Sequence, residues 1–216
     1  MHLIMKGFHP VLLVLYFAWI QPCTAQSKAS RIEVFKDFYQ GSRGNCVYVA
    51  TIKAGVMTFG IDSVFKKLDI NKDSLITVTL RDPAKKIIQV THAELQQART
   101  ACGFRKNTDA KPNRMYDLAI ICYAVMAKVK SNEKQKFSET LQTMDKGEDV
   151  KSAFKYLGLG KYVTHKRPLT NTKGKCPIIV GNRKHAAYAC YGDMDLWGKT
   201  KRLKWWLYWG RFEVRK

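Results

Sequence analysis

A stretch of apolar residues at 116–129, YDLAIICYAVMAKV, constrains the fold more than any other part of the 216-residue sequence. Its apolar side chains fall on almost every side of a helix, whereas a surface helix is apolar on one face only. The stretch therefore predicts a helix that is buried all round and covered by other elements. With 46% apolar residues, the chain is globular, and its length suffices for one domain with a real core.

Helices are predicted mainly in the earlier part of the chain and strands mainly in the last part. Apolar residues recur at helical spacing from Cys46 to Gly60, and Thr91 with Glu94 has the spacing of a capping box that starts a helix to about Cys102. Further helices are predicted at 62–68, 133–144 and 148–157, and a two-stranded hairpin at 75–80 and 86–90. Short strands follow at 177–180, 184–191, 194–197 and 203–214. This order predicts an α+β fold in a single catalytic domain spanning 26–216.

Residues 1–25 have the features of a cleaved export signal. Lys6 gives a positive start, 11–20 is an apolar run, and small residues precede Gln26, the expected new N-terminus. The run is too short to span a bilayer comfortably, and no second run follows it. The mature chain is therefore expected to have no membrane span and to be secreted or periplasmic, with an uncleaved anchor as the alternative.

Removal of this signal also removes Cys23 and leaves five cysteines: Cys46, Cys102, Cys122, Cys176 and Cys190. An oxidising compartment favours disulfides, and an odd number leaves one thiol free or paired outside the chain. Cys46 is the candidate for the free thiol. The other four allow three pairings. A hairpin turning at 181–184 would place Cys176 nearly opposite Cys190, so 176–190 with 102–122 is favoured.

The net charge is +21, and it falls to +20 when Lys6 is lost. Such a basic field raises the local concentration of anionic partners, such as nucleic acid, acidic polysaccharide, a phospholipid surface or an acidic peptide. The sequence has no zinc-finger spacing, RNP aromatic motif or basic zipper that would indicate specific nucleic-acid recognition. A solvated basic surface is the simpler interpretation of the charge.

Residues 40–46, QGSRGNC, place a cysteine at the predicted start of a helix. The unpaired amides and the dipole at a helix N-terminus favour the thiolate, which is the nucleophilic form of the side chain. Gly41 and Gly44 would let the backbone turn tightly and come close to a substrate. The Gln40 amide and the Cys46 backbone N–H could together hold an oxyanion. The pattern predicts a nucleophilic cysteine rather than a buried structural one.

A nucleophilic cysteine needs a histidine, and the mature chain offers His92, His165 and His185. His92 is better explained by the helix start around it, and His165 by an exposed loop before a proline. His185 opens the stretch HAAYAC, whose small residues leave room for it to face a cleft, so it is the predicted base. A turn at 191–193 would return Asp195 beside it to orient the imidazole, with Asp193 as the second choice.

QGSRGNC resembles the active-site signature of papain-like cysteine peptidases, and KHAAYACYGDMDLWG is similar to their His-Ala segment followed by Asn/Asp-x-Trp-Gly. The stretches LITVTLRD, THAELQQA and YDLAIICYAVMAK are more loosely similar to calpain-type catalytic domains. The resemblance spans most of the chain from Tyr39 to about Gly198. It implies a papain-like fold, in which a helix carrying Cys46 packs on a small antiparallel sheet carrying His185, with a cleft between them.

The chain departs from that family at three points. Val47 stands where the family usually has an aromatic residue, Asp195 replaces the commoner asparagine, and the separation of His185 from Asp195 is shorter than in papain. The first two changes are compatible with the mechanism, and the shorter separation suggests a pared-down sheet. None of the three removes a catalytic group. An inactive homologue is the alternative.

The sequence thus predicts an exported cysteine hydrolase, foremost a peptidase acting on peptides or proteins, that needs neither metal nor other cofactor. Cys46 attacks the carbonyl carbon, and His185 takes and returns the proton. Asp195 orients the His185 imidazole, and Gln40 helps to hold the oxyanion. The same residues could serve an isopeptide or cell-wall amide hydrolase or an acyltransferase. A further alternative is a basic secreted binding module that recognises an anionic surface.

Overall fold

The computed structural model describes residues 31–71, 75–82, 87–106, 113–131, 135–166, 172, 174–204, 208 and 210–216. The predicted export signal at 1–25 lies outside these ranges. Within them, no helix combines the length and the apolar character that a membrane crossing requires.

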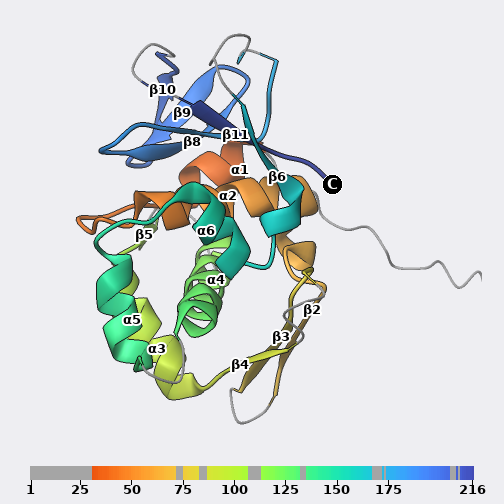
Figure 1. Cartoon of the computed structure of the whole chain (residues 1–216), viewed down its shortest axis with the longest axis vertical. Coiled ribbons are helices and arrows are strands. Elements are labelled where there is room, and N and C mark those ends of the chain that lie inside the picture. Colours follow the sequence, from red (N-terminus) through yellow and green to blue (C-terminus); the bar gives the residue numbers. More distant parts are fainter. Residues whose placement is uncertain are drawn as a thin grey trace, which may run out of the picture.

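The helices gather in the first three quarters of the described chain (Figure 1). They are α1 (Arg31–Lys36), α2 (Cys46–Phe59), α3 (His92–Cys102), α4 (Arg114–Lys130), α5 (Phe137–Met144) and α6 (Val150–Tyr156), with 3-10 turns at Ile61–Ser63 and Gly160–Tyr162. The predicted capping box is confirmed, because the Thr91 hydroxyl accepts from the Glu94 N–H while the Glu94 carboxylate accepts from the Thr91 N–H.

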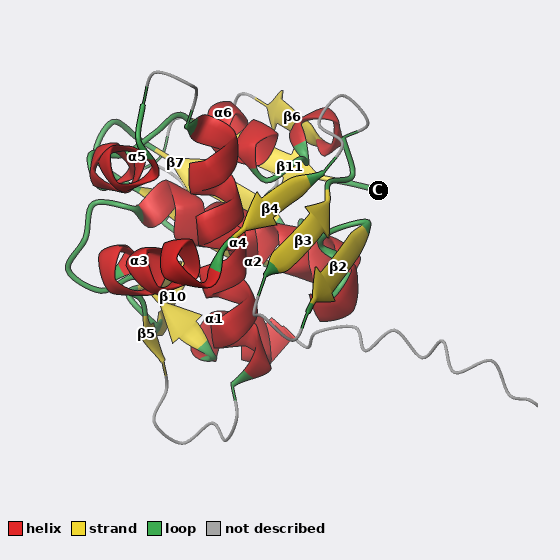
Figure 2. Cartoon of the chain, turned by 90° about the horizontal axis from the view of Figure 1, so that it is seen from below, coloured by secondary structure: helices red, strands yellow, loops and turns green. Residues whose placement is uncertain are grey.

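Within the described residues, the strands form three antiparallel sheets. The largest has the order β10-β9-β8-β7-β11-β6 and combines Lys199–Arg202, Asp193–Leu196, Ala186–Cys190, Ile178–Gly181, Gly210–Val214 and Val163–Lys166. A second sheet joins β2 (Lys67–Ile70), β3 (Ile76–Thr79) and β4 (Ile88–Val90), which lie side by side in Figure 2. A short pair joins β1 (Phe38–Tyr39) to β5 (Arg105–Lys106). The α+β class is therefore confirmed.

Helix α4 is the buried helix that the apolar stretch predicts. Every residue at 118–127 is buried, and α4 contacts α2, α3, α5, α6 and β4. Figure 1 shows α4 in the middle of the helical part of the chain. Burying each of its large apolar side chains stabilises the fold by roughly 1.5–3 kcal/mol, so the stretch organises the helices around it.

Helix α2 lies between the six-stranded sheet and the other helices. Every residue at 47–56 is buried, and α2 contacts β7, β8 and β11 as well as α1, α4 and α6. One core cluster therefore continues from the helices into the sheet through Ile179, Ala186, Tyr188 and Val214. A separate cluster that includes Val180, Ala187 and Met194 lies apart from it. This arrangement sets the first residue of α2 against the start of β8.

Three predicted elements are wrong. The segment predicted as a helix at 62–68 is instead a 3-10 turn followed by the exposed strand β2. The side chains of Val64 and Phe65 are buried in the core, and residues 67–70 pair with β3. Of the strand predicted at 203–214, Gly210–Val214 forms β11, Leu203, Lys204 and Tyr208 are not in a strand, and 205–207 and 209 lie outside the described residues. The basic segment around His165 is strand β6, since it pairs with β11.

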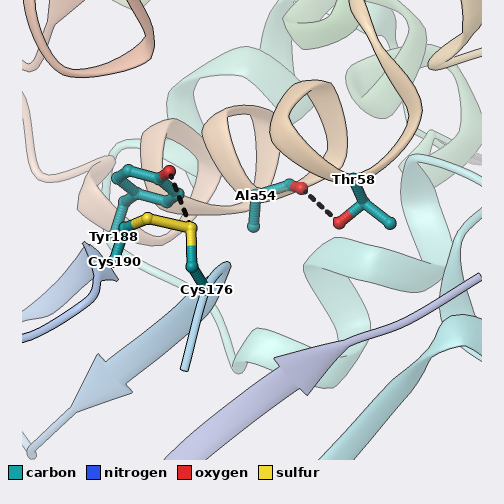
Figure 3. The surroundings of a disulfide bond; sticks show 5 residues. All are labelled: Ala54, Thr58, Cys176, Tyr188 and Cys190. Carbon is teal, nitrogen blue, oxygen red and sulfur yellow. Dashed lines mark hydrogen bonds between the residues drawn. A yellow bond between two sulfur atoms is a disulfide. The ribbon is translucent and has the colours of Figure 1, made fainter. Parts of the chain in front are cut away.

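The structure settles two cysteine predictions in opposite ways. A disulfide joins Cys176 to Cys190, as expected, and Figure 3 shows it beside Tyr188, whose hydroxyl is 3.9 Å from the Cys176 sulfur. The pairing of Cys102 with Cys122 is wrong, because both are free buried thiols. The Cys102 sulfur instead donates to the Arg99 carbonyl at 3.3 Å. Burial raises the pKa of the Cys122 thiol.

Candidate active site

The loop at 40–46 is held by two close contacts between backbones. A side chain carbon added to Gly41 would lie 2.2 Å from the Gly103 carbonyl oxygen, and one added to Gly44 would lie 2.2 Å from the Asp145 carbonyl oxygen. Only glycine fits at such distances. The two glycines therefore allow contact with neighbouring chain segments, whereas the sequence suggested that they make room for a substrate.

A carboxylate at the end of α5 holds the same loop. Asp145 accepts from the Gly44 N–H at 2.9 Å, and the Arg43 guanidinium lies 3.2 Å from its other oxygen. Asn45 is fully buried and donates from its amide to the Cys102 carbonyl at 2.7 Å. These contacts with α5 and α3 fix the residue that immediately precedes Cys46.

Cys46 is the first residue of α2, and its thiol is not in a disulfide. The first N–H groups of a helix have no acceptor within it, so they point toward the space before the helix. The Cys46 sulfur is partly buried and accepts from the Ala186 N–H at 3.4 Å. The sulfur thus lies against the residue that follows His185.

A tight turn places His185 at the start of β8. The Asn182 side chain accepts from the Lys184 N–H and from the His185 N–H, each at 2.9 Å, while the Asn182 N–H donates to the His185 carbonyl at 2.9 Å. The imidazole is half-buried with its centroid 5.4 Å from a Trp197 ring. Its Nε2 is buried and has no hydrogen-bond partner within the described ranges. Burial lowers the pKa of His185, and the charge of Asp195 opposes that shift.

The predicted orienting carboxylate, Asp195, has a different set of partners from the one expected. Its Oδ2 lies 2.6 Å from the Nζ of Lys53, and its Oδ1 accepts from the Gly198 N–H at 2.8 Å. Lys53 is completely buried and Asp195 is 7% exposed. Asp195 therefore influences His185 through its charge, while its hydrogen bonds go to Lys53 and to the turn at 197–198.

The second choice, Asp193, lies at the start of β9 and forms an ion pair with Arg202 at 3.5 Å. Gln40 follows β1, and its amide Nε2 donates to the Arg43 carbonyl at 2.5 Å. Because the amide group carries two N–H donors, this bond leaves a second one for another acceptor.

Two hollows meet at Cys46. The smaller one brings all four predicted site residues together and is lined by Gln40, Cys46, His185, Asp195 and Trp197, among others. The larger one is a groove of about 590 Å³ that runs between the segment 145–150 and the turn at 181–186. Cys46, His185 and Ala186 line both hollows. An extended chain lying in the groove would therefore pass Cys46.

Sequence reasoning missed two residues of this region. His165, interpreted as an exposed loop residue, lines the groove and stacks on Phe212 with ring centroids 4.6 Å apart. Its position depends on pairing between β6 and β11, which no local pattern reveals. Lys53 did leave a signal, because a lysine inside the mostly apolar run VYVATIKAGV needs a buried partner.

Within the described residues, no group of histidine, cysteine and acidic side chains is arranged to hold a metal ion. Comparisons with protein-family models, with curated proteins and with solved structures find no match for this chain. The site is therefore interpreted from its own geometry.

Proposed function

We propose that this chain is an exported cysteine hydrolase of papain-like type that cleaves peptide bonds. One observation carries the proposal. An unpaired cysteine thiol stands at the first position of a buried helix, beside His185 and at the edge of a groove. A thiolate, a histidine and a bordering cleft are what acyl transfer by a cysteine requires.

In the first step the Cys46 sulfur bonds to the carbonyl carbon of the substrate. The His185 imidazolium donates its proton to the leaving amine nitrogen as the C–N bond breaks, which leaves a thioester on Cys46. The negative charge that develops on the carbonyl oxygen would be held by the Cys46 backbone N–H and the second N–H of the Gln40 amide. This assignment is supported by the position of Gln40 in the same hollow as Cys46.

In the second step His185 takes a proton from a water molecule, whose oxygen attacks the thioester carbon. The C–S bond breaks, the acid leaves, and the thiolate and imidazolium are restored. The lowered pKa of His185 suits this step, because the imidazole must be neutral to accept the proton.

Export is proposed on two grounds. The N-terminal sequence at 1–25 has the features of a signal, and the Cys176–Cys190 disulfide suits an oxidising compartment.

The proposal is tested by thiol reactivity. The folded, unreduced protein is treated with iodoacetamide from about pH 4 to about pH 9, and the label is located by mass spectrometry. We expect Cys46 to be labelled rapidly below about pH 6, where an ordinary thiol is protonated. Cys102 and Cys122 are buried internal controls that should stay unlabelled.

Two histidine variants provide the matched comparison. His185→Ala should abolish the fast labelling at low pH, whereas His92→Ala, at an exposed position on α3, should leave it unchanged. An unreactive Cys46 in the folded protein, or equal effects of both variants, would contradict the proposal.

A further inference from the structure

We propose that Lys53 is a positioning residue of this site, which binds the Asp195 carboxylate near His185 and thereby weakens the support that Asp195 gives to the imidazolium. The inference rests on the proposed function for its catalytic meaning. Its physical content, a control of His185 by a buried ion pair, can be measured separately.

The surroundings of Lys53 are those of a charged ammonium. Its Nζ lies 2.6 Å from Asp195 Oδ2 and 3.1 Å from the Phe35 carbonyl oxygen, and 4.9 Å from the centre of the Phe38 ring. All three partners are electron-rich, so they favour the protonated amine. Burial lowers the pKa of Lys53, and the charge of Asp195 opposes that shift. The pair is therefore an ion pair cut off from water.

Asp195 in turn fixes the turn that faces His185. Trp197 and Gly198 connect β9 to β10 with φ angles of 52° and 78°, which is the conformation of a two-residue hairpin turn. Asp195 Oδ1 accepts from the Gly198 N–H within this turn, and the Trp197 ring packs on the His185 imidazole. Lys53 can thus influence His185 indirectly in two ways, through the charge of Asp195 and through the position of Trp197.

The charges around His185 predict in which direction its basicity changes. A carboxylate alone near an imidazole stabilises the imidazolium, whereas a carboxylate paired with an ammonium has little net charge to offer. Lys53 offsets part of the Asp195 charge at close range, so the pKa of His185 stays below its usual value, as burial imposes. Removal of the ammonium should therefore make His185 a stronger base.

The other titratable groups near His185 do not reverse this conclusion. Asp37 acts on Lys53 from the end of α1, and Cys46 lines the same hollow as His185. Along the groove the acids are each held by donors: Asp145 by Arg43, Glu148 by Lys130 at 2.6 Å, and Asp149 by the first N–H groups of α6. The remaining groups are His165 and the basic residues Lys146, Arg183 and Lys184.

The test follows the titration of His185 by NMR of the imidazole nitrogens, in a Cys46→Ala background that removes coupling to the thiolate. Lys53→Met should raise the His185 midpoint by about one pH unit, because a lone carboxylate then faces the imidazole. Lys53→Met combined with Asp195→Asn removes both charges and should return the midpoint to near its starting value. Lys128→Met, at a lysine paired with Glu94 away from the site, is the matched control and should leave it unchanged.

A folded Lys53→Met protein with an unmoved or lowered His185 midpoint would overturn the inference. Because that variant leaves a buried carboxylate unpaired, Lys53→Gln is made as well, since it keeps a hydrogen-bond donor without the charge. The background protein provides a test that needs no Lys53 variant: its His185 midpoint should lie at or below about 6.5, and a value above about 7.5 would exclude cancellation by Lys53.

The outcome is separable from that of the proposed function. A His185 midpoint that moves as expected together with an inert Cys46 would keep the ion-pair control and reject the hydrolase. A reactive Cys46 together with a His185 midpoint that does not change in Lys53→Met would support the hydrolase and reject the ion-pair control.

Discussion

The carboxylate of Asp145 accepts a hydrogen bond from the backbone N–H of Gly44 at 2.9 Å, across 101 residues of sequence. This bond ties the end of α5 to the loop that presents Cys46. The end of α2 that carries Cys46 is therefore held by a residue that takes no part in the proposed chemistry.

Loss of that carboxylate should loosen the loop. Asp145→Ala removes the acceptor of the Gly44 N–H and the partner of Arg43, so the rate of Cys46 alkylation should fall on the order of tenfold. Asp117→Ala, which breaks a comparable exposed contact with Arg99, is the control and should leave the rate unchanged. Equal rates in Asp145→Ala and the wild type would show that the loop is held without this bond.

The two loop glycines should tolerate no side chain. Gly41→Ala and Gly44→Ala each force a carbon to 2.2 Å from a carbonyl oxygen, so each should lower the free energy of unfolding by about 2 kcal/mol or more. Gly174→Ala is the matched control, because nothing lies within 4 Å of its added carbon. Urea denaturation of the three variants measures the difference. Equal free energies of unfolding in all three would show that the loop accommodates the added carbon at no cost.

Gln40 should contribute to turnover and not to labelling of the thiol. If its amide holds the oxyanion, Gln40→Ala should lower kcat on a cleaved peptide on the order of 100-fold. The alkylation rate of Cys46 should remain near that of the wild type, because alkylation develops no such oxyanion. A negligible change in kcat would place the oxyanion donors elsewhere.

The Glu94–Lys128 contact should make the stability fall in acid. Burial by itself would raise the pKa of Glu94, but the hydrogen bonds from Lys128 and Thr91 outweigh it and hold that pKa below its usual value. A carboxyl whose pKa is lowered by folding stabilises the protein above its unfolded pKa, and this contribution is lost as the pH falls through the folded value. Denaturation from about pH 6 to about pH 3 should show a smaller loss of stability in Glu94→Gln than in the wild type. An equal loss of stability with falling pH in Glu94→Gln and in the wild type would contradict this contribution of Glu94.

The disulfide should account for a measurable part of the stability. Cys176 and Cys190 are separated by 14 residues, and closing a loop of that length stabilises a fold by about 3 kcal/mol. Replacing both cysteines with serine should lower the unfolding free energy by about that amount. Titration of thiols in the denatured, unreduced chain lacking 1–25 should find three, at Cys46, Cys102 and Cys122. A count of one would instead support the 102–122 pairing.

Local patterns in the sequence determined much of the framework. The apolar run of α4 allowed no exposed face, the capping box fixed the start of α3, and the helix after QGSRGNC put Cys46 at an N-terminus. These features depend on interactions between residues a few positions apart, so the local sequence is enough to predict them.

The tertiary structure alone decided which distant residues meet. Lys53 and Asp195 are 142 residues apart, and their contact exists because α2 packs on β8 and β9 pairs with that strand. His165 reached the groove through the pairing of β6 with β11, and Cys102 on α3 and Cys122 on α4 are separate buried thiols. A sequence specifies a lysine in an apolar helix, but only the packing of helix on sheet selects the carboxylate that compensates its charge.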